Sequence, residues 1–141
     1  MADFTPRAGN NAKVTKGEST VLGMGNWKMD GISTDQLEYT SFGDTAKKFI
    51  SGMLDYGQIT FSGFYDPADT SGQDAIFKAN LSNTKLTDLR LYINNTSYWC
   101  ANLTADSASG AYVTSASIGF DKSGLGTIDF TLKATGPWVL V

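Results

Sequence analysis

The chain has 141 residues, of which 41% are hydrophobic and 18% are charged. This length fits one domain, and the apolar content is enough for a packed core, which excludes an intrinsically disordered chain. The net charge is −3 and the 11 Lys and Arg residues are scattered, which argues against a DNA-binding protein because such proteins need a basic patch.

The N-terminal residues 1–17 are polar, which predicts an extended arm. The remaining residues, 18–141, are expected to form a single domain. Its first strand is predicted over 18–30, because apolar and polar residues alternate there. Gly23 and Gly25 lie within this strand and indicate a bulge or a close approach of another backbone.

Residues 31–57 break the strand pattern and predict a long loop with weak regular structure. The segment is nevertheless rich in large apolar side chains, unlike a solvated loop. We therefore expect it to bury against another surface, together with two side chains of the preceding strand. The residues expected at this surface, which is a self-assembly interface if the chain assembles with copies of itself, are Trp27, Met29, Tyr39, Phe42, Phe49, Ile50, Met53, Leu54 and Tyr56.

A half-buried strand is predicted over 58–65 from its alternation, and Asp66-Pro67 ends it. Thr70 and Gln73 have the spacing of a capping box, with Thr70 as the N-cap. They predict one helix over 71–81, the only substantial helix of the chain.

Four further strands are predicted, over 85–94, 97–104, 110–121 and 125–135. The side chains expected to point inward from the last two are Tyr112, Ala116, Ile118, Phe120, Ile128, Phe130, Leu132 and Ala134. The whole pattern predicts a mainly β fold, a β-sandwich or partly rolled barrel with one flanking α-helix.

The residue types argue against an enzyme. The chain has no histidine, so Ser-His and Cys-His pairs are excluded, and its single cysteine, Cys100, excludes a cysteine-based metal site. Asp66, Asp69 and Asp74 do not have the spacing of a calcium loop. We therefore expect no catalytic residue, no cofactor and no metal site.

The first half of the chain carries a series of short pieces in a fixed order. They are GMGNW over 23–27, MDGIS over 29–33, YTSFGD over 39–44 and FISGMLDYGQITFSGFYDPAD over 49–69, followed by Gln73. In order and spacing this series resembles the tail tube proteins of long-tailed phages. The resemblance covers nearly half the chain, and the C-terminal half agrees in being rich in strands.

The resemblance implies a structural subunit with a β-sandwich flanked by a helix. Such subunits form rings, usually of six, whose inner wall is a continuous β-barrel, and the rings stack into a hollow tube for DNA ejection. The implied partners are further copies of the chain, the tape-measure, tail terminator and tail-tip proteins, and double-stranded DNA that passes without sequence-specific binding. The implied location is the virion, after synthesis in the cytoplasm of a host bacterium.

The residues expected to face the lumen of such a tube are Lys28, Asp30, Glu38, Thr127, Asp129 and Thr131. No apolar run approaches the roughly 20 residues of a membrane-spanning helix, so no membrane partner is expected. Two alternatives remain open. One is a related ring-forming protein, such as a secretion-system tube protein or a tail terminator. The other is a carbohydrate-binding β-sandwich that uses Trp27 or Trp99 as a stacking platform.

Overall fold

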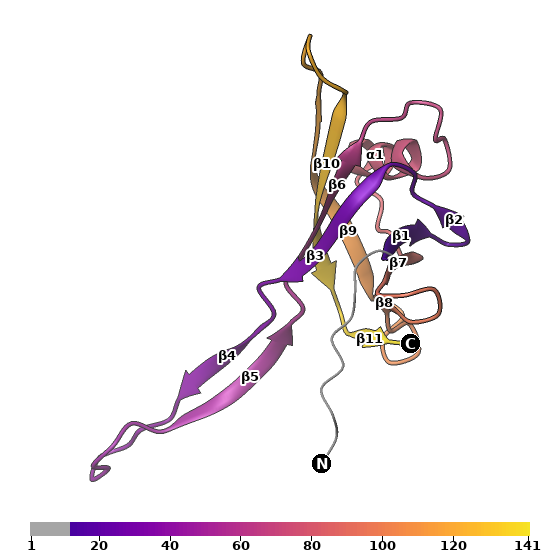
Figure 1. The fold of residues 1–141 in the computed structure, drawn as a ribbon. Coiled ribbons are helices and arrows are strands. Elements are labelled where there is room, and N and C mark those ends of the chain that lie inside the picture. Colours follow the sequence, from indigo (N-terminus) through magenta and orange to yellow (C-terminus); the bar gives the residue numbers. More distant parts are fainter. Residues whose placement is uncertain (1–11) are drawn as a thin grey trace, which may run out of the picture.

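A computed structural model describes residues 12–141 of the chain. Two antiparallel sheets pack face to face, a helix lies beside them, and a long hairpin projects from the body (Figure 1). The four-stranded sheet has the order β3 (Met24–Asp30), β6 (Gln58–Phe64), β10 (Thr127–Thr135), β9 (Gly110–Gly119). The five-stranded sheet has the order β11 (Trp138–Leu140), β8 (Tyr98–Ala101), β7 (Leu89–Tyr92), β1 (Lys13–Lys16), β2 (Ser19–Thr20). The helix is α1 (Gln73–Ser82), and the hairpin pairs β4 (Ser33–Glu38) with β5 (Phe49–Asp55).

The hydrophobic core lies between the two larger sheets and α1. Strands β6 and β10 contribute alternate residues to it, and the rings of Phe61 and Phe130 lie 5.2 Å apart. The other large, fully buried apolar side chains among residues 12–141 are Val14, Ile59, Ile76, Leu89, Leu91, Ile128 and Leu132. The predicted mainly β fold with one helix is therefore confirmed, as is the predicted inward face of β10.

The predicted inward face of β9 is wrong for its first half. Ala111 and Val113 are buried, whereas Tyr112 is exposed. The prediction is also wrong for Phe120, which follows the end of β9 and is 73% exposed. The register with β10 shifts between Val113 and Ser115, where Thr114 is an extra residue whose hydroxyl donates to the Thr131 carbonyl at 3.0 Å. Such a bulge reverses the alternation of a strand, and no residue type in the sequence signals it.

Of the two glycines predicted to mark a bulge or a close backbone approach, Gly25 in β3 forms a bulge, and Gly23 just before β3 lies close to the Phe64 carbonyl. Met24 pairs with Gly63 and Asn26 with Ser62, which leaves Gly25 without a partner on β6. The extra residue shifts the alternation of the strand, so Trp27 points to the core and Lys28 to solvent.

The predicted arm over 1–17 is wrong for its last residues. Residues 13–16 form β1, which pairs with β7, and Val14 is buried in the core. Residues 1–11 lie outside the described part of the chain. The sequence does not reveal this strand, because four residues are too short for a convincing alternation.

The prediction of the helix is confirmed, but that of its cap is wrong. The N-cap residue is Gly72, and Thr70 is exposed. Asp69 supplies the capping oxygen instead, since its Oδ2 accepts from the backbone N–H of Gln73 at 3.1 Å and of Leu22 at 2.9 Å. One carboxylate therefore joins the start of α1 to the segment between β2 and β3.

Candidate self-assembly surfaces

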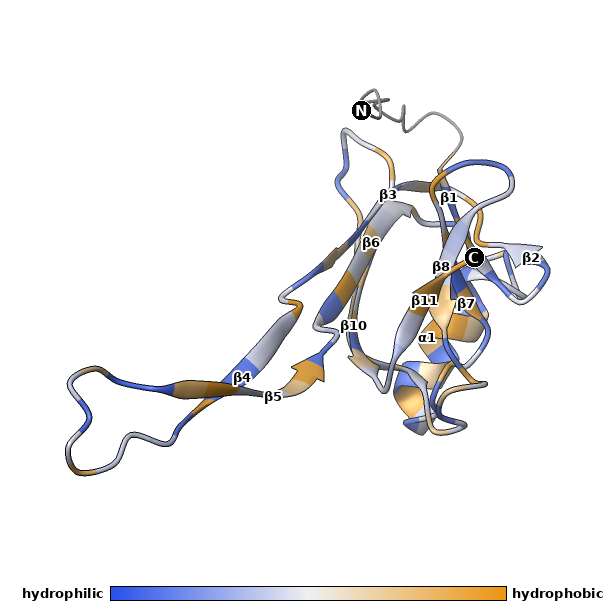
Figure 2. Ribbon diagram, turned by 90° about the horizontal axis from the view of Figure 1, so that it is seen from below, coloured by the Kyte–Doolittle hydropathy of each residue, from blue (hydrophilic) through white to orange (hydrophobic). Residues whose placement is uncertain are grey.

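The segment over 31–57 is a regular two-stranded hairpin, so the prediction of a loop with weak regular structure is wrong. Strands β4 and β5 pair from Ser33 opposite Asp55 to Glu38 opposite Phe49, and they extend away from both larger sheets (Figures 1 and 2). An isolated hairpin of two strands is only marginally stable in water. A further partner would therefore stabilise it.

The hairpin exposes apolar side chains on both faces. Leu37 lies opposite Ile50 on one face, and Phe49 lies opposite Glu38 on the other. Phe42, between the two strands at the tip, is fully exposed, and Met53, near the base of the hairpin, is 86% exposed. The apolar residues of the hairpin that are roughly half exposed or more are Leu37, Tyr39, Phe42, Phe49, Ile50, Met53 and Leu54. Contiguous exposed apolar surface of this kind is typical of an interaction site.

Three residues of the expected interface are instead part of the domain's own packing. Trp27, Met29 and Tyr56 are half-buried against the core. Trp27 Nε1 also donates to the Tyr92 carbonyl at 2.9 Å, which joins the two larger sheets. Trp99 is likewise half-buried against the core, so neither tryptophan presents an open ring for sugar stacking.

The base of the hairpin is fastened to the four-stranded sheet. Lys133 Nζ of β10 donates to Asp55 Oδ1 at 2.5 Å and to the Gly57 carbonyl at 3.2 Å. Gly57 has a φ of +78°, and a side chain there would collide with the Asp30 carbonyl. The backbone just before β6 therefore passes so close to the end of β3 that only glycine fits at position 57.

We predict that Lys133→Met frees the hairpin base while the core stays folded. The hydrogen bond from Lys133 lowers the pKa of the Asp55 carboxyl below its ordinary 3.8. The ion pair is therefore complete above pH 3.8 and is lost as the pH falls through the lowered pKa. In Lys133→Met, an NMR titration is expected to show the Asp55 pKa returning toward its ordinary value.

Lys28→Met is the matched control, since Lys28 pairs with Asp30 at 3.4 Å and not with the hairpin. It is expected to leave the Asp55 titration unchanged. An Asp55 pKa that stays low in Lys133→Met would contradict the assignment of the ion pair.

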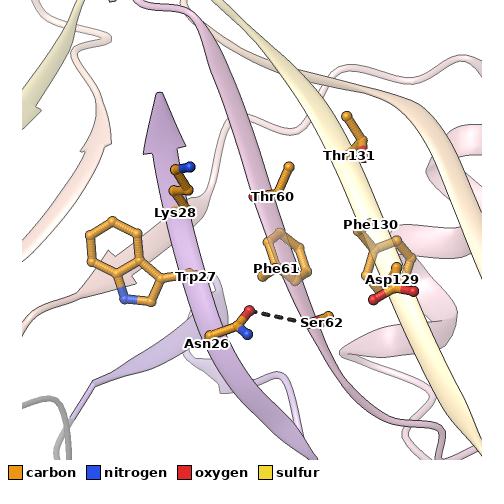
Figure 3. A pocket seen from close by; sticks show the side chains of 9 residues that line it. All are labelled: Asn26, Trp27, Lys28, Thr60, Phe61, Ser62, Asp129, Phe130 and Thr131. Carbon is orange, nitrogen blue, oxygen red and sulfur yellow. Dashed lines mark hydrogen bonds between the residues drawn. The ribbon is translucent and has the colours of Figure 1, made fainter. Parts of the chain in front are cut away.

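The outward face of the four-stranded sheet is a second surface, which we call the polar face. Its cross-strand rows bring together Lys28, Thr60 and Thr131, and likewise Asn26, Ser62 and Asp129. Figure 3 shows these side chains around a shallow depression, with the Ser62 hydroxyl donating to Asn26 Oδ1 at 3.1 Å. The polar side chains of this face are Asn26, Lys28, Asp30, Gln58, Thr60, Ser62, Ser115, Ser117, Thr127, Asp129, Thr131 and Lys133. At its two ends, the exposed rings of Tyr112 and Phe64 lie in the same rows as Lys133 and Thr127.

Five of the six residues expected to face a lumen lie on this face. They are Lys28, Asp30, Thr127, Asp129 and Thr131. The sixth, Glu38, does not, because it lies at the end of β4 on the projecting hairpin. The polar residues of β6 were missing from the expected set, although their alternation with Ile59 and Phe61 is visible in the sequence.

The polar face carries little net charge. Its charged groups are two lysines and two aspartates, and one of each forms the Lys28–Asp30 pair. The remaining members are uncharged Ser, Thr, Asn and Gln. Such a surface offers hydrogen bonds but no continuous row of cations for a phosphate backbone.

Both edges of the four-stranded sheet are available for pairing within the described residues. Strand β3 ends the sheet on one side and β9 on the other. An isolated bridge between Leu86 and Ala111 covers the start of β9, and no strand pairs with the rest of that edge among residues 12–141. An open edge is a template for adding another chain.

Groups that suggest other chemistry are few in the described part of the chain. Among residues 12–141, no cluster of His, Cys, Asp or Glu could hold a metal ion. Burial raises the pKa of the Cys100 thiol, which disfavours the reactive thiolate. The one helix of residues 12–141 does not meet the length and apolarity of a membrane span.

The folded chain is similar to subunits of several tail and injection assemblies. A chain from the tail of an empty gene transfer agent particle, which has C6 symmetry, superposes with a TM-score of 0.72 at 12% identity, over 96% of this chain and 99% of that one. A chain from the sheath/tube terminator of an extracellular contractile injection system superposes with a TM-score of 0.71 at 17% identity, over 99% of each chain. The chain has a tail-tube fold.

A third solved structure has the same fold. A chain from the tube-terminating cap of the anti-feeding prophage superposes with a TM-score of 0.68 at 19% identity, over 100% of this chain and 94% of that one. No protein-family model matches the sequence, and no curated protein matches it significantly. The fold is therefore detected by comparison of structures and not by comparison of sequences with family models or curated proteins. It agrees with the resemblance described in the sequence analysis.

Proposed function

We propose that the chain is a structural subunit of a phage tail tube. In this proposal it assembles into hexameric rings, and the rings stack into a hollow conduit for DNA ejection. The observation that carries the proposal is the β4–β5 hairpin, whose apolar side chains have no cover within the described domain. A monomer gains nothing from such a hairpin, whereas a polymer buries it in every copy.

Ring closure follows from the open sheet. In the ring, the β3 edge of one copy pairs with the β9 edge of the next, so that no edge remains. The tail of the empty gene transfer agent particle, which contains a chain of the same fold, has C6 symmetry. Six sheets joined in this way form one continuous barrel.

The lumen is lined by the polar face in this arrangement. The opposite face of the same sheet is buried against the core, so the polar face is the one left to line a closed barrel. Its uncharged side chains and balanced charges do not retain a phosphate backbone, which suits a conduit for double-stranded DNA. The proposal thus needs no catalytic residue.

Electron microscopy of the concentrated, purified protein tests the proposal. Negative-stain images are expected to show long hollow tubes with a regular axial repeat, and dilute samples to show free subunits or single rings. Monomer at every concentration would refute the tail-tube assignment. Closed single rings that never stack would favour the second candidate, a tail terminator, because the sheath/tube terminator of the injection system shares this fold.

A further inference from the structure

The two outer strands of the four-stranded sheet each contain one extra residue. In β3 it is Gly25, and in β9 it is Thr114, whereas the inner strands β6 and β10 pair with each other without a shift in register (Figure 1). The bulges therefore lie on the two strands whose outer edges have open pairing sites. A bulge interrupts regular pairing, so a bulge on an outer strand limits where a further strand can add.

Each bulge is followed by a regular run of five residues, 26–30 in β3 and 115–119 in β9. On the other side of its bulge, β9 is already bonded to the domain's own backbone. The Leu86 N–H donates to the Ala111 carbonyl at 2.7 Å, and the Ala111 N–H donates to the Leu86 carbonyl at 2.9 Å. A regular strand from another copy can therefore pair with β9 along the run 115–119.

The two runs match in direction and in the alternation of their side chains. Each neighbouring pair of strands in the sheet is antiparallel, so β3 and β9 run in opposite directions. Rotation about a tube axis keeps these directions, and β9 of one copy is therefore antiparallel to β3 of the next. The first, third and fifth residues of both runs belong to the polar face, and they are Asn26, Lys28, Asp30, Ser115, Ser117 and Gly119.

The unpaired backbone groups of the two runs also correspond. Alternate residues of an antiparallel strand bond to opposite neighbours. The Phe64 N–H of β6 bonds toward β3, to the Gly23 carbonyl at 2.9 Å, and the alternation can be followed from there across the sheet. It leaves the second and fourth residues of each run with backbone groups directed out of the sheet, and these are Trp27, Met29, Ala116 and Ile118.

We propose that the two bulges fix the register between neighbouring copies, with Lys28 of one copy opposite Ser117 of the next. In this register all five residues of each run are paired, and polar positions lie beside polar positions. A slip of one residue places polar side chains opposite apolar ones. A slip of two residues in either direction pairs only three residues, because a bulge or the end of a strand interrupts the ladder. The inference rests on the proposed ring and names the residues that set its register.

Disulfide crosslinking measures the register. The test chain carries Cys100→Ser, Lys28→Cys and Ser117→Cys, and it is assembled and then oxidised. Opposite residues that are not hydrogen-bonded to each other have Cα atoms about 4.5 Å apart, which suits a disulfide. Within one copy the two positions are three strand spacings apart, about 14 Å, so a link joins two copies. Linked oligomers of up to six chains are expected on a non-reducing gel.

The matched control replaces Ser117→Cys by Ser115→Cys, which reports a slip of two residues on the same face. It is expected to give at least about fivefold less linked chain, because a diagonal pair exceeds the span of a disulfide. Asp30→Cys with Ser115→Cys reports the proposed register at a second place, and it is expected to link as well as the test chain. It also serves if the Lys28 variant assembles poorly.

Deletion of Thr114 tests whether the bulge sets the register. Without this residue the alternation of β9 is unbroken from Ala111 onward, so the fold is expected to persist by circular dichroism. The slipped register then also pairs five residues, and the Lys28→Cys, Ser115→Cys chain is expected to link about as well as the Ser117→Cys chain. Thr114→Ala keeps the extra residue and is expected to keep the original preference.

The outcomes separate this inference from the proposed function. Tubes in which the Ser115→Cys control links as well as the test chain overturn the register while leaving the tail tube intact. An unchanged preference after deletion of Thr114 overturns the role of the bulge. Absence of rings and tubes from the unchanged chain refutes both proposals.

Discussion

Met53→Asp is expected to abolish tube assembly while the subunit remains folded. Met53 is 86% exposed and lies outside the core, so its replacement leaves the packing of the domain unchanged. In the assembled tube, the change removes a buried apolar side chain and places a carboxylate in its position. The combined penalty is about 3 kcal/mol or more per subunit, which raises the critical concentration at least about 100-fold.

The measurement is the sedimenting fraction across a concentration series, with circular dichroism to verify folding. Met53→Leu keeps the apolar surface and is the matched control, expected to assemble normally. Phe49→Asp is expected to behave like Met53→Asp, because Phe49 belongs to the same exposed hairpin. Normal tubes from either aspartate variant would show that these side chains stay in water, and the assignment of the hairpin as an interface would be wrong.

Strand alternation predicted most of the sandwich, because a sheet with one buried face imposes it directly on the sequence. Strand β10 is the clearest case, since Ile128 and Leu132 are fully buried while Asp129 and Lys133 are exposed. The prediction failed for β9, where Thr114 forms a bulge that shifts the pattern by one residue. A bulge is decided by the pairing of two strands, so a single strand does not reveal it.

The candidate interface shows what hydrophobicity alone leaves undecided. Trp27 and Met53 are both large and apolar, yet Trp27 bonds to Tyr92 in the opposite sheet and Met53 is in water. The difference arises from tertiary position, which the residue type does not encode. The same limit applies to Glu38, which lies on the projecting hairpin and not on the polar face with Lys28, because the crossing at Gly57 sends the hairpin out of the sheet.

The hairpin was not predicted from the sequence, because its strands lack a regular alternation. Residues 31–57 contain glycines and no clean alternation, since β5 has two residues, Gly52 and Met53, opposite Asp35 of β4. The absence of a buried face removes the usual signal of a strand, because apolar side chains lie exposed on both faces of the hairpin. Such a segment departs from the alternation that identifies the strands of the sandwich.

Gln73→Ala is expected to destabilise the subunit by about 3 kcal/mol, because it removes a buried amide that makes three hydrogen bonds. Gln73 is buried at the start of α1. Its Nε2 donates to the Leu22 carbonyl at 2.5 Å and to the Phe64 carbonyl at 2.7 Å, and its Oε1 accepts from the Asp66 backbone N–H at 2.8 Å. Truncation removes all three bonds and leaves their backbone partners without the amide.

Asn80→Ala is the matched control, because Asn80 is also an amide on α1 but makes a single bond, from Nδ2 to the Val113 carbonyl at 2.9 Å. It is expected to cost about 1 kcal/mol. The free energy of unfolding is measured in urea on chains that also carry Met53→Asp, so that assembly does not add to the stability. A loss in Gln73→Ala no larger than that in Asn80→Ala would mean that water replaces the buried amide. The junction between α1, β6 and the segment before β3 would then owe its stability to the Asp69 carboxylate, which bonds the N–H groups of Leu22 and Gln73.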